Sequence, residues 1–142
     1  MMSLSVEERE QFLAEPLVAV LSVAAGSERG PVTAPVWYAY RPGGDVLLFT
    51  GRTSRKARLI EQTGRFTLTV QTTSPTYRYT AVEGRAAFVA VTPELVNEVA
   101  ARYLSAEKVS EYAAGVLEHG EELIGIRLRP ERWNAADLGP SH

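Results

Sequence analysis

Cysteine is absent from this 142-residue chain, and histidine occurs only twice, as His119 and His142. Without thiols the chain can form neither disulfides nor cysteine-based metal sites, and thiol catalysis is excluded as well. Neither histidine has a neighbouring metal-ligand residue at a typical spacing, so we expect no metal site. No serine lies in a Gly-x-Ser-x-Gly setting, and no spacing marks a pair of carboxylates. Hydrolytic chemistry is therefore unsupported.

Long apolar runs and a strong net charge are also missing. No segment approaches the roughly 20 apolar residues that span a bilayer. The first 16 residues are acidic and helix-like, unlike a signal peptide. With 15 basic and 17 acidic residues the formal net charge is −2, so no general positive field attracts nucleic acid or an anionic membrane. We expect a soluble, cytoplasmic protein without nucleic-acid or membrane partners, in which any anion site is local.

Strand signals dominate the rest of the chain. The length and the 45% hydrophobic content suit a single domain, residues 1–142, with one core. Six segments are rich in β-branched residues or alternate with period two, namely 17–24, 31–41, 46–50, 65–72, 76–91 and 122–129. Gly84 interrupts the fifth of these stretches, which predicts a bent strand. Residues 139–142 look like a frayed end.

Helical signals are fewer and shorter. Ser5 and Glu8 have the spacing of a capping box, which predicts a helix ending near Pro16. Helical patterns also lie at residues 53–63, from 92 onward and at 106–117. The balance predicts a mainly β fold with accessory helices, and a closed or split β-barrel of six or seven antiparallel strands fits better than alternating β/α units.

The densest basic cluster runs from Thr50 to Arg58 (TGRTSRKAR), where a strand gives way to a helix. Free amides and the dipole at a helix N-terminus favour anions. The hydroxyls of Thr50, Thr53 and Ser54, with the charges of Arg55 and Lys56, would complete a phosphate cradle. The alternative is a solvated helix face whose basic residues pair with Glu61.

Aromatic residues gather in two of the predicted strands. Trp37, Tyr38 and Tyr40 lie in one, and Tyr77 and Tyr79 lie in another. Residues of the same parity face one side of a strand, so these rings can line a shared core or a shared pocket. A flat aromatic cofactor needs such walls. We also interpret residues 36–40 as an exposed aromatic strand, which favours a homodimer.

Three segments resemble one known family. Residues 49–70 (FTGRTSRKARLIEQTGRFTLTV) are similar to the flavin-binding segment of the pyridoxamine phosphate oxidase family, where an aromatic-Thr pair ends a strand and Ser-Arg-Lys follows. Residues 32–40 (VTAPVWYAY) resemble the strand that lines the flavin ring, and residues 79–84 (YTAVEG) resemble the return strand with its glycine. The resemblance covers about residues 15–90.

The resemblance implies the FMN-binding split β-barrel of Greek-key type, a homodimer with two flavins between its subunits. It assigns the FMN phosphate to Arg55 and Lys56 and the ribityl chain or phosphate to Phe49 and Thr50. Further cofactor contacts would come from Ser54, Ala34, Pro35, Val36 and Trp37, and from Tyr79, which stands where the vitamin enzyme has a flavin-contacting glutamine. The reaction implied is flavin-dependent oxidation or reduction of a small organic substrate, with no side chain assigned to catalysis.

Two departures separate the chain from the vitamin oxidase. Ala39 stands where that enzyme has its substrate-phosphate lysine, and we expect the longer C-terminal arm of its active site to be lacking. The substrate should therefore differ. Arginine far exceeds lysine in this alanine-rich chain, as in branches of the superfamily that use the deazaflavin coenzyme F-420. Two alternatives to an FMN oxidoreductase follow, an F-420-dependent reductase and a non-catalytic binder of flavin or a haem-type ligand.

Overall fold

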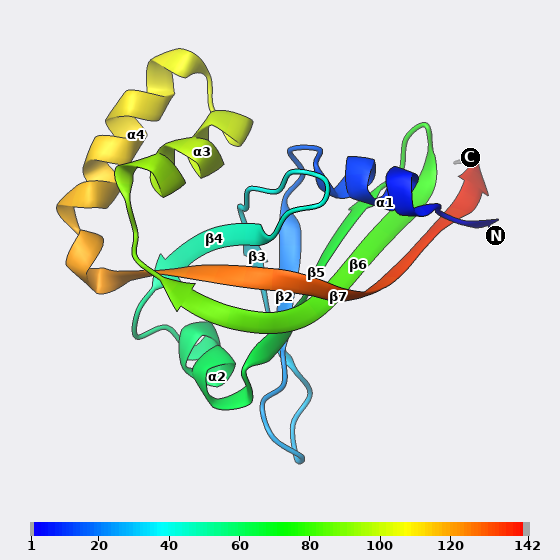
Figure 1. The fold of residues 1–142 in the computed structure, drawn as a ribbon, viewed down its shortest axis with the longest axis horizontal. Coiled ribbons are helices and arrows are strands. Elements are labelled where there is room, and N and C mark those ends of the chain that lie inside the picture. Colours follow the sequence, from blue (N-terminus) through cyan, green and yellow to red (C-terminus); the bar gives the residue numbers. More distant parts are fainter. Residues whose placement is uncertain (1, 141–142) are drawn as a thin grey trace.

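Residues 2–140 of the chain are described by a computed structural model. They form seven strands, four α-helices and one 3-10 turn, drawn in Figure 1. The strands are β1 (Met2–Ser3), β2 (Ala19–Val23), β3 (Val32–Val36), β4 (Val46–Gly51), β5 (Arg65–Thr72), β6 (Thr76–Val89) and β7 (Leu123–Pro140). The helices are α1 (Val6–Leu13), α2 (Arg55–Thr63), α3 (Pro93–Tyr103) and α4 (Ala106–Glu118), and the 3-10 turn is Gly120–Glu122.

All strand pairs are antiparallel. The main path runs β1-β7-β6-β5-β2-β3, and β4 pairs with the first half of β7. Since β4 lies beside β7 while β5, β6 and β7 follow one another as neighbours, these four strands form a Greek key. A single bridge between Ala39 and Leu47 connects the chain after β3 to β4 and closes the ring. The predicted mainly β, split-barrel fold is confirmed.

The two longest strands, β6 and β7, curve around the barrel because β6 is bent at Gly84 (Figure 1). The register with β7 shifts between Glu83 and Gly84, opposite Pro130, which has no amide hydrogen to give to the ladder. A Cβ at Gly84 would lie 1.7 Å from the carbonyl oxygen of Arg129. Only glycine fits this contact. The bend predicted at Gly84 is therefore confirmed, and the close approach of the Arg129 carbonyl explains why glycine is needed there.

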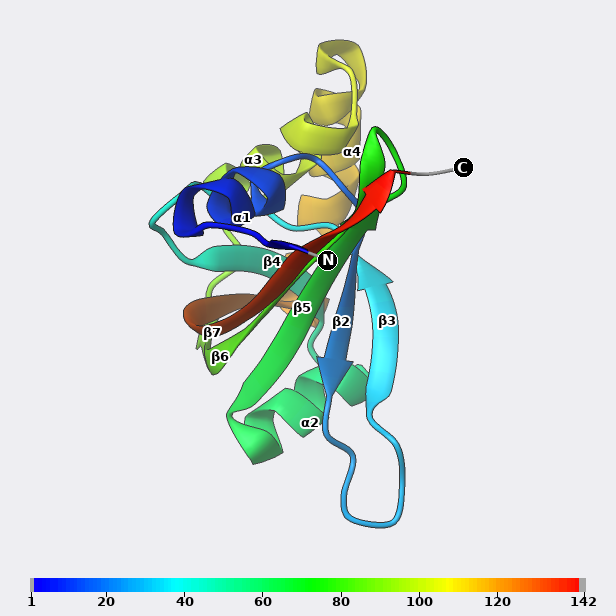
Figure 2. The same cartoon turned by 90° about the vertical axis from the view of Figure 1, so that its right-hand side faces the viewer.

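The core fills the interior of the barrel, and two helices lie at its opposite ends (Figure 2). Phe12 and Leu13 of α1 enter the core from one end, and Ile60 of α2 enters from the other. The predicted capping box holds the start of α1, since Ser5 and Glu8 each bond the other's backbone amide. The predicted helices therefore form, and they close the barrel.

A helical hairpin, α3 and α4, stands beside the barrel (Figure 1). Leu95 and Val99 of α3 pack with Ala39, whose side chain is 2% exposed. Arg102 donates to the carbonyls of Ala14 and Glu15 after α1, at 3.0 and 2.8 Å. The hairpin is thus attached to β4 and to the end of α1.

Three predictions about strands are corrected by the structure. The strand expected over 31–41 ends at Val36, because Tyr38 bonds side-chain and carbonyl groups of other elements instead of a strand partner. The aromatic segment expected to be exposed is buried, with Tyr38 at 0% and Tyr40 at 4% exposure, so it gives no argument for a dimer. The last strand continues from Arg129 to Pro140 by pairing with β6, so residues 139–140 are not frayed. Residues 141–142 lie outside the described part.

Within the same residues, no helix is both long enough and apolar enough to cross a membrane. The longest helix, α4, has 13 residues.

Candidate functional site

A pocket of about 200 Å³ lies where the ends of β3 and β4 meet the first turn of α2. The helical hairpin contributes to one wall. The residues that line it are Pro35, Val36, Trp37, Phe49, Thr50, Lys56, Val99 and Tyr112. Six of these eight residues are apolar or aromatic, and the polar side-chain groups are one hydroxyl, one ammonium, one phenol and one indole N–H. The pocket therefore suits a flat apolar group with an anion at one end.

The start of α2 is fixed by local sequence. Ser54 is the N-cap, and its Oγ accepts a hydrogen bond from the amide of Ala57 at 3.2 Å. Gly64 ends the helix in the left-handed conformation, with φ of 74°. The Oγ of Ser54 keeps its own proton while it accepts this hydrogen bond, so the hydroxyl can still donate. The free amides of the first turn thus lie beside Lys56.

The basic residues of this segment have different roles. Arg52 is held by protein carbonyls, since its guanidinium donates to those of Glu121 and Leu123 at 3.3 and 3.2 Å. Arg55 is exposed, and Lys56 is half-buried at the pocket. Within residues 2–140 neither Arg55 nor Lys56 forms an ion pair, with Glu61 or with any other carboxylate. Both charges are therefore free to meet an anion from outside.

The aromatic side of the pocket is formed by Trp37, Phe49 and Tyr112. The indole of Trp37 is stacked on Tyr103, with centroids 4.7 Å apart, and it meets Tyr112 at 5.7 Å and a tilt of 42°. Burial raises the pKa of the Tyr112 phenol, so the hydroxyl stays protonated at neutral pH and can donate. Trp37 is thereby held in one orientation at the wall.

The family model described as pyridoxamine 5'-phosphate oxidase matches residues 5–135. The chain belongs to this family. The match includes β2 to β6, all residues that line the pocket, the helical hairpin and most of β7. Among curated proteins, no sequence matches the chain.

Solved structures share the fold of the family at low sequence identity. A conserved hypothetical protein of Mycobacterium tuberculosis, Rv2991, superposes with a TM-score of 0.73 and 22% identity, over 96% of this chain and 86% of that one. A protein described as an F420 reductase has a TM-score of 0.64 and 22% identity, covering 88% and 94%. A FAD-binding protein of Mesorhizobium loti has a TM-score of 0.64 and 17% identity, covering 95% and 94%.

Six of the ten cofactor residues predicted from the sequence line the pocket together. They are Pro35, Val36, Trp37, Phe49, Thr50 and Lys56. The other four are not part of its lining. Ser54 and Arg55 belong to the adjoining helix start, and Ala34 precedes Pro35 on β3. Tyr79 lies on β6 and donates its hydroxyl to Asn134 at 3.0 Å.

Val99 and Tyr112 are pocket residues that the sequence did not reveal. Both lie on helices whose apolar positions have ordinary amphipathic spacing, so nothing distinguishes them from core residues. The one signal was an aromatic ring on α4, a helix whose only buried residue is Ala113. The ring of Tyr112 therefore packs against a residue outside α4, which is Trp37.

Proposed function

We propose that this protein binds FMN in the pocket beside Lys56 and acts as a flavin-dependent oxidoreductase on a small organic substrate. One observation carries the proposal. A single pocket has an unpaired ammonium and a hydroxyl, from Lys56 and Thr50, at the same helix start that would bind a phosphate, and aromatic walls next to them. This arrangement matches a flavin mononucleotide, in which a flat ring system is joined to a charged phosphate.

The donors at the helix start fit a phosphate group. Lys56 supplies a charge, and Arg55 stands at the first position of α2 with no carboxylate partner within residues 2–140. The hydroxyls of Thr50 and Ser54 and the amides of the first turn add neutral donors. Charge-assisted hydrogen bonds of this kind contribute about 1.5–3 kcal/mol each. The residues present therefore fit the phosphate end of the cofactor.

The opposite end of the pocket fits a flat ring. Trp37 and Tyr112 offer aromatic surface, while Val36 and Val99 offer aliphatic surface. β3 is the last strand on the sheet path, so within residues 2–140 one edge of its backbone has no strand partner. Such edge groups can address ring heteroatoms.

The role of the protein in the reaction is to bind and orient. A bound flavin supplies the hydride or electron transfer. Lys56 and Tyr112 are the only ionisable residues in the lining of the pocket as the structure describes it. Lys56 is assigned to the phosphate, and Tyr112 remains a protonated donor at the wall. We therefore assign no side chain as acid or base.

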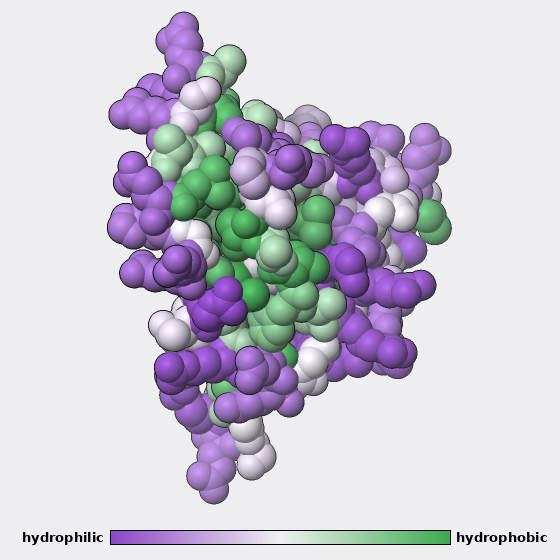
Figure 3. Space-filling view, turned by 60° about the vertical axis from the view of Figure 1, so that its left-hand side comes forward, coloured by the Kyte–Doolittle hydropathy of each residue, from purple (hydrophilic) through white to green (hydrophobic). Residues whose placement is uncertain are grey.

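We further propose that two chains form a homodimer that completes the pocket. A volume of about 200 Å³ is below the roughly 300–1,000 Å³ of enclosed ligand sites, so one chain surrounds only part of a flavin. The side of the molecule with the helical hairpin also presents hydrophobic residues in its middle, ringed by hydrophilic ones (Figure 3). Such a patch favours association. Light scattering should give twice the mass of one chain, and a monomer at micromolar concentration would contradict the interface.

The absorption spectrum of the purified protein is the most direct test. A yellow protein with the spectrum of oxidised FMN, released on denaturation, is the expected result. A chromophore with a deazaflavin spectrum would instead support a coenzyme F-420-dependent reductase, a function named for one structural neighbour. Bound flavin that no nicotinamide or deazaflavin donor reduces would indicate a binding protein. A chain that takes up neither cofactor on titration would refute the proposal.

A further inference from the structure

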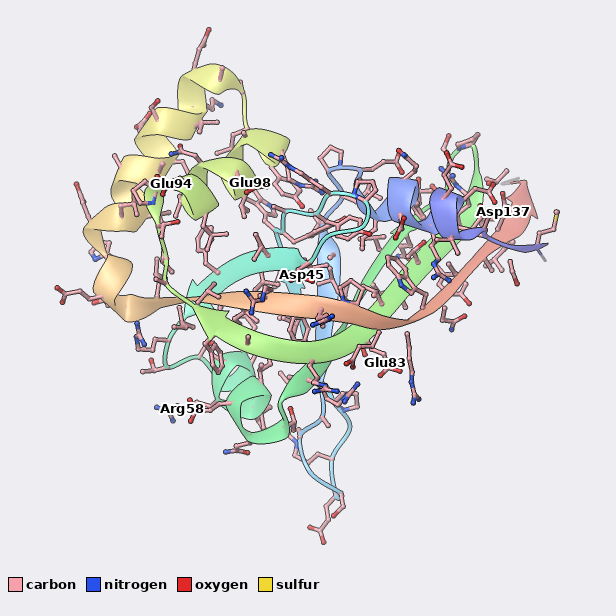
Figure 4. All side chains as sticks on the ribbon, in the orientation of Figure 1. Asp45, Arg58, Glu83, Glu94, Glu98 and Asp137 are labelled. Carbon is pink, nitrogen blue, oxygen red and sulfur yellow. The ribbon has the colours of Figure 1, made fainter. Side chains whose placement is uncertain are left out.

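A second hollow lies at the other end of β4 from the proposed flavin site. This arginine groove has a volume of about 570 Å³ and is lined by Asp45, Arg85, Ala86, Ala87, Arg127, Arg129 and Glu131. Asp45 comes just before β4, whereas Phe49 and Thr50 at the far end of that strand line the flavin pocket. Figure 4 shows Asp45 above the middle of β7, with side-chain nitrogens beside it. The two sites therefore lie toward different ends of β4 and share no lining residue.

Three arginines lie in direct register on neighbouring strands, and two of them, Arg85 and Arg129, line the groove. Arg65 of β5 is opposite Arg85 of β6, and Arg85 is opposite Arg129 of β7. Like charges placed directly opposite each other destabilise a sheet. The fold alone does not require this row, because alanines fill the neighbouring positions 86 and 87 of the same strand. An anion bound from outside would relieve the repulsion.

The local acids neutralise only part of this charge. Glu131 accepts from Arg65 at 2.8 Å and from Arg85 at 3.1 Å, and Asp45 lies 3.6 Å from Arg127. No carboxylate of residues 2–140 pairs with Arg129. The lining of the groove holds three arginines and two carboxylates, so the groove carries one net positive charge in a chain whose net charge is −2.

An adjoining hollow of about 400 Å³ shares Asp45 and Arg129 with the groove. It also includes Glu10, Tyr40 and the turn at Gly43. Tyr40 is 4% exposed, and its hydroxyl has no hydrogen-bond partner among the described residues. Burial and then Glu10 raise the pKa of this phenol, while the backbone of Gly43 and the charge of Arg9 act in the opposite sense. The hydroxyl is a buried donor on a residue that lines the same hollow as two carboxylates, Glu10 and Asp45.

We propose that the groove and this hollow together bind a small diphosphate that carries a sugar. The diphosphate lies on Arg85, Arg127 and Arg129, whose forked donors match phosphoryl oxygens. A phosphate cannot extend toward Glu10 and Asp45, since like charges repel, but sugar hydroxyls can donate to both carboxylates. The hydroxyl of Tyr40 then donates to a sugar oxygen. A nucleoside diphosphate has this order of groups.

The test uses the full chain saturated with FMN, so that the flavin pocket cannot take up the probe. Calorimetric titration with ADP and with inorganic pyrophosphate should show one site per chain for each. Arg129→Ala should weaken both probes by about tenfold or more, the loss expected for one charged contact. Tyr40→Phe should weaken ADP and leave pyrophosphate unchanged. Arg29→Ala, which removes an exposed arginine of the β2–β3 loop, is the matched control and should change neither.

Each result has one meaning. Equal losses in Arg129→Ala and Arg29→Ala would show a diffuse charge effect and overturn the site. Loss in Lys56→Ala but not in Arg129→Ala would place the probe in the flavin pocket and also overturn it. An unchanged ADP affinity in Tyr40→Phe would overturn the extension toward Tyr40. FMN affinity should be the same in Arg129→Ala and wild type. A failure of the diphosphate proposal can therefore be distinguished from a failure of the proposed flavin function. Should Arg129→Ala fail to fold, Arg127→Ala gives the same comparison.

Discussion

The indole of Trp37 lies parallel to the ring of Tyr103, with centroids 4.7 Å apart and planes at 11°. The Tyr103 hydroxyl accepts from the amide of Tyr38 at 3.2 Å and donates to the carbonyl of Leu17 at 2.9 Å. One residue of α3 thus fixes both the ring and the backbone beside the pocket. Since Tyr103 belongs to α3, these contacts make the helical hairpin part of the structure that supports the site.

Two substitutions at Tyr103 should separate these roles. Tyr103→Phe keeps the stack but leaves buried backbone groups without a partner, so it should lower the free energy of unfolding by about 1–3 kcal/mol. FMN affinity should change less than about twofold, since the stack is worth only about 0.5–1.5 kcal/mol and is retained. Tyr103→Leu should lose both stability and FMN affinity. Urea unfolding and FMN titration measure the two effects, and equal FMN affinity in both variants would contradict a role for the stack.

Lys56 and Arg55 should contribute unequally to phosphate binding. Lys56 lines the pocket and is half-buried, whereas Arg55 is exposed and outside the lining. Lys56→Ala should weaken FMN by roughly ten- to hundredfold, because it removes a charge-assisted bond of about 1.5–3 kcal/mol. Arg55→Ala should have a smaller effect, since water screens an exposed charge.

Riboflavin supplies the control for this pair. It lacks the phosphate, so its affinity should be low in wild type and should fall little further in either variant. Neither substitution should alter stability by more than about 0.5 kcal/mol. If Lys56→Ala weakened FMN and riboflavin equally, the residue would not be the phosphate anchor.

The protein should not oxidise pyridoxamine phosphate efficiently. Ala39, which the family resemblance places where the vitamin oxidase has its substrate-phosphate lysine, is 2% exposed and packs against Leu95 and Val99. The helical hairpin therefore covers the place where that charge would be needed. Ala39→Lys should not create the activity, and it should destabilise the fold because it buries an unpaired ammonium. Turnover of that substrate by wild type at a typical enzyme rate, on the order of 10 per second, would contradict this prediction.

Gly84→Ala should be strongly destabilising. Its new Cβ would lie 1.7 Å from the carbonyl oxygen of Arg129, a backbone atom that cannot move without breaking the β6–β7 ladder. Overpacking of this kind costs about 1–3 kcal/mol, and the backbone contact places this variant at the upper end or beyond. Gly115→Ala is the matched control, because a Cβ there meets nothing within 4 Å and the site is inside α4. It should stabilise by up to about 1 kcal/mol. Thermal unfolding of both variants should shift in opposite directions.

Local sequence was sufficient for the features that depend on near neighbours. Ser54 caps α2 through an amide three residues away, so the helix start beside Lys56 could be read directly. The capping box of α1 is equally local. The bend at Gly84 followed from a glycine inside a strand pattern. These patterns, with the family resemblance, were enough for the barrel and for six of the pocket residues.

Sequence reasoning was wrong where distant elements replace strand partners. Tyr38 has a strand-like sequence, but its amide and hydroxyl bond Tyr103 and Leu13, so β3 ends early and the ring is buried. β7 continues beyond Pro130 because β6 is long enough to pair with it. In both cases tertiary contacts outweigh local propensity.

The sequence by itself determined which polar residues lie at the junction of β4 and α2 beside the pocket, since Thr50, Ser54 and Lys56 are near neighbours in the chain. Only the tertiary structure decided that Tyr112 would complete the pocket, because it comes from a helix more than 50 residues away in the sequence. The row of three arginines across β5, β6 and β7 also depends on the tertiary structure. Arg65, Arg85 and Arg129 look like three isolated surface charges until strand register, set by the bend in β6, places them side by side.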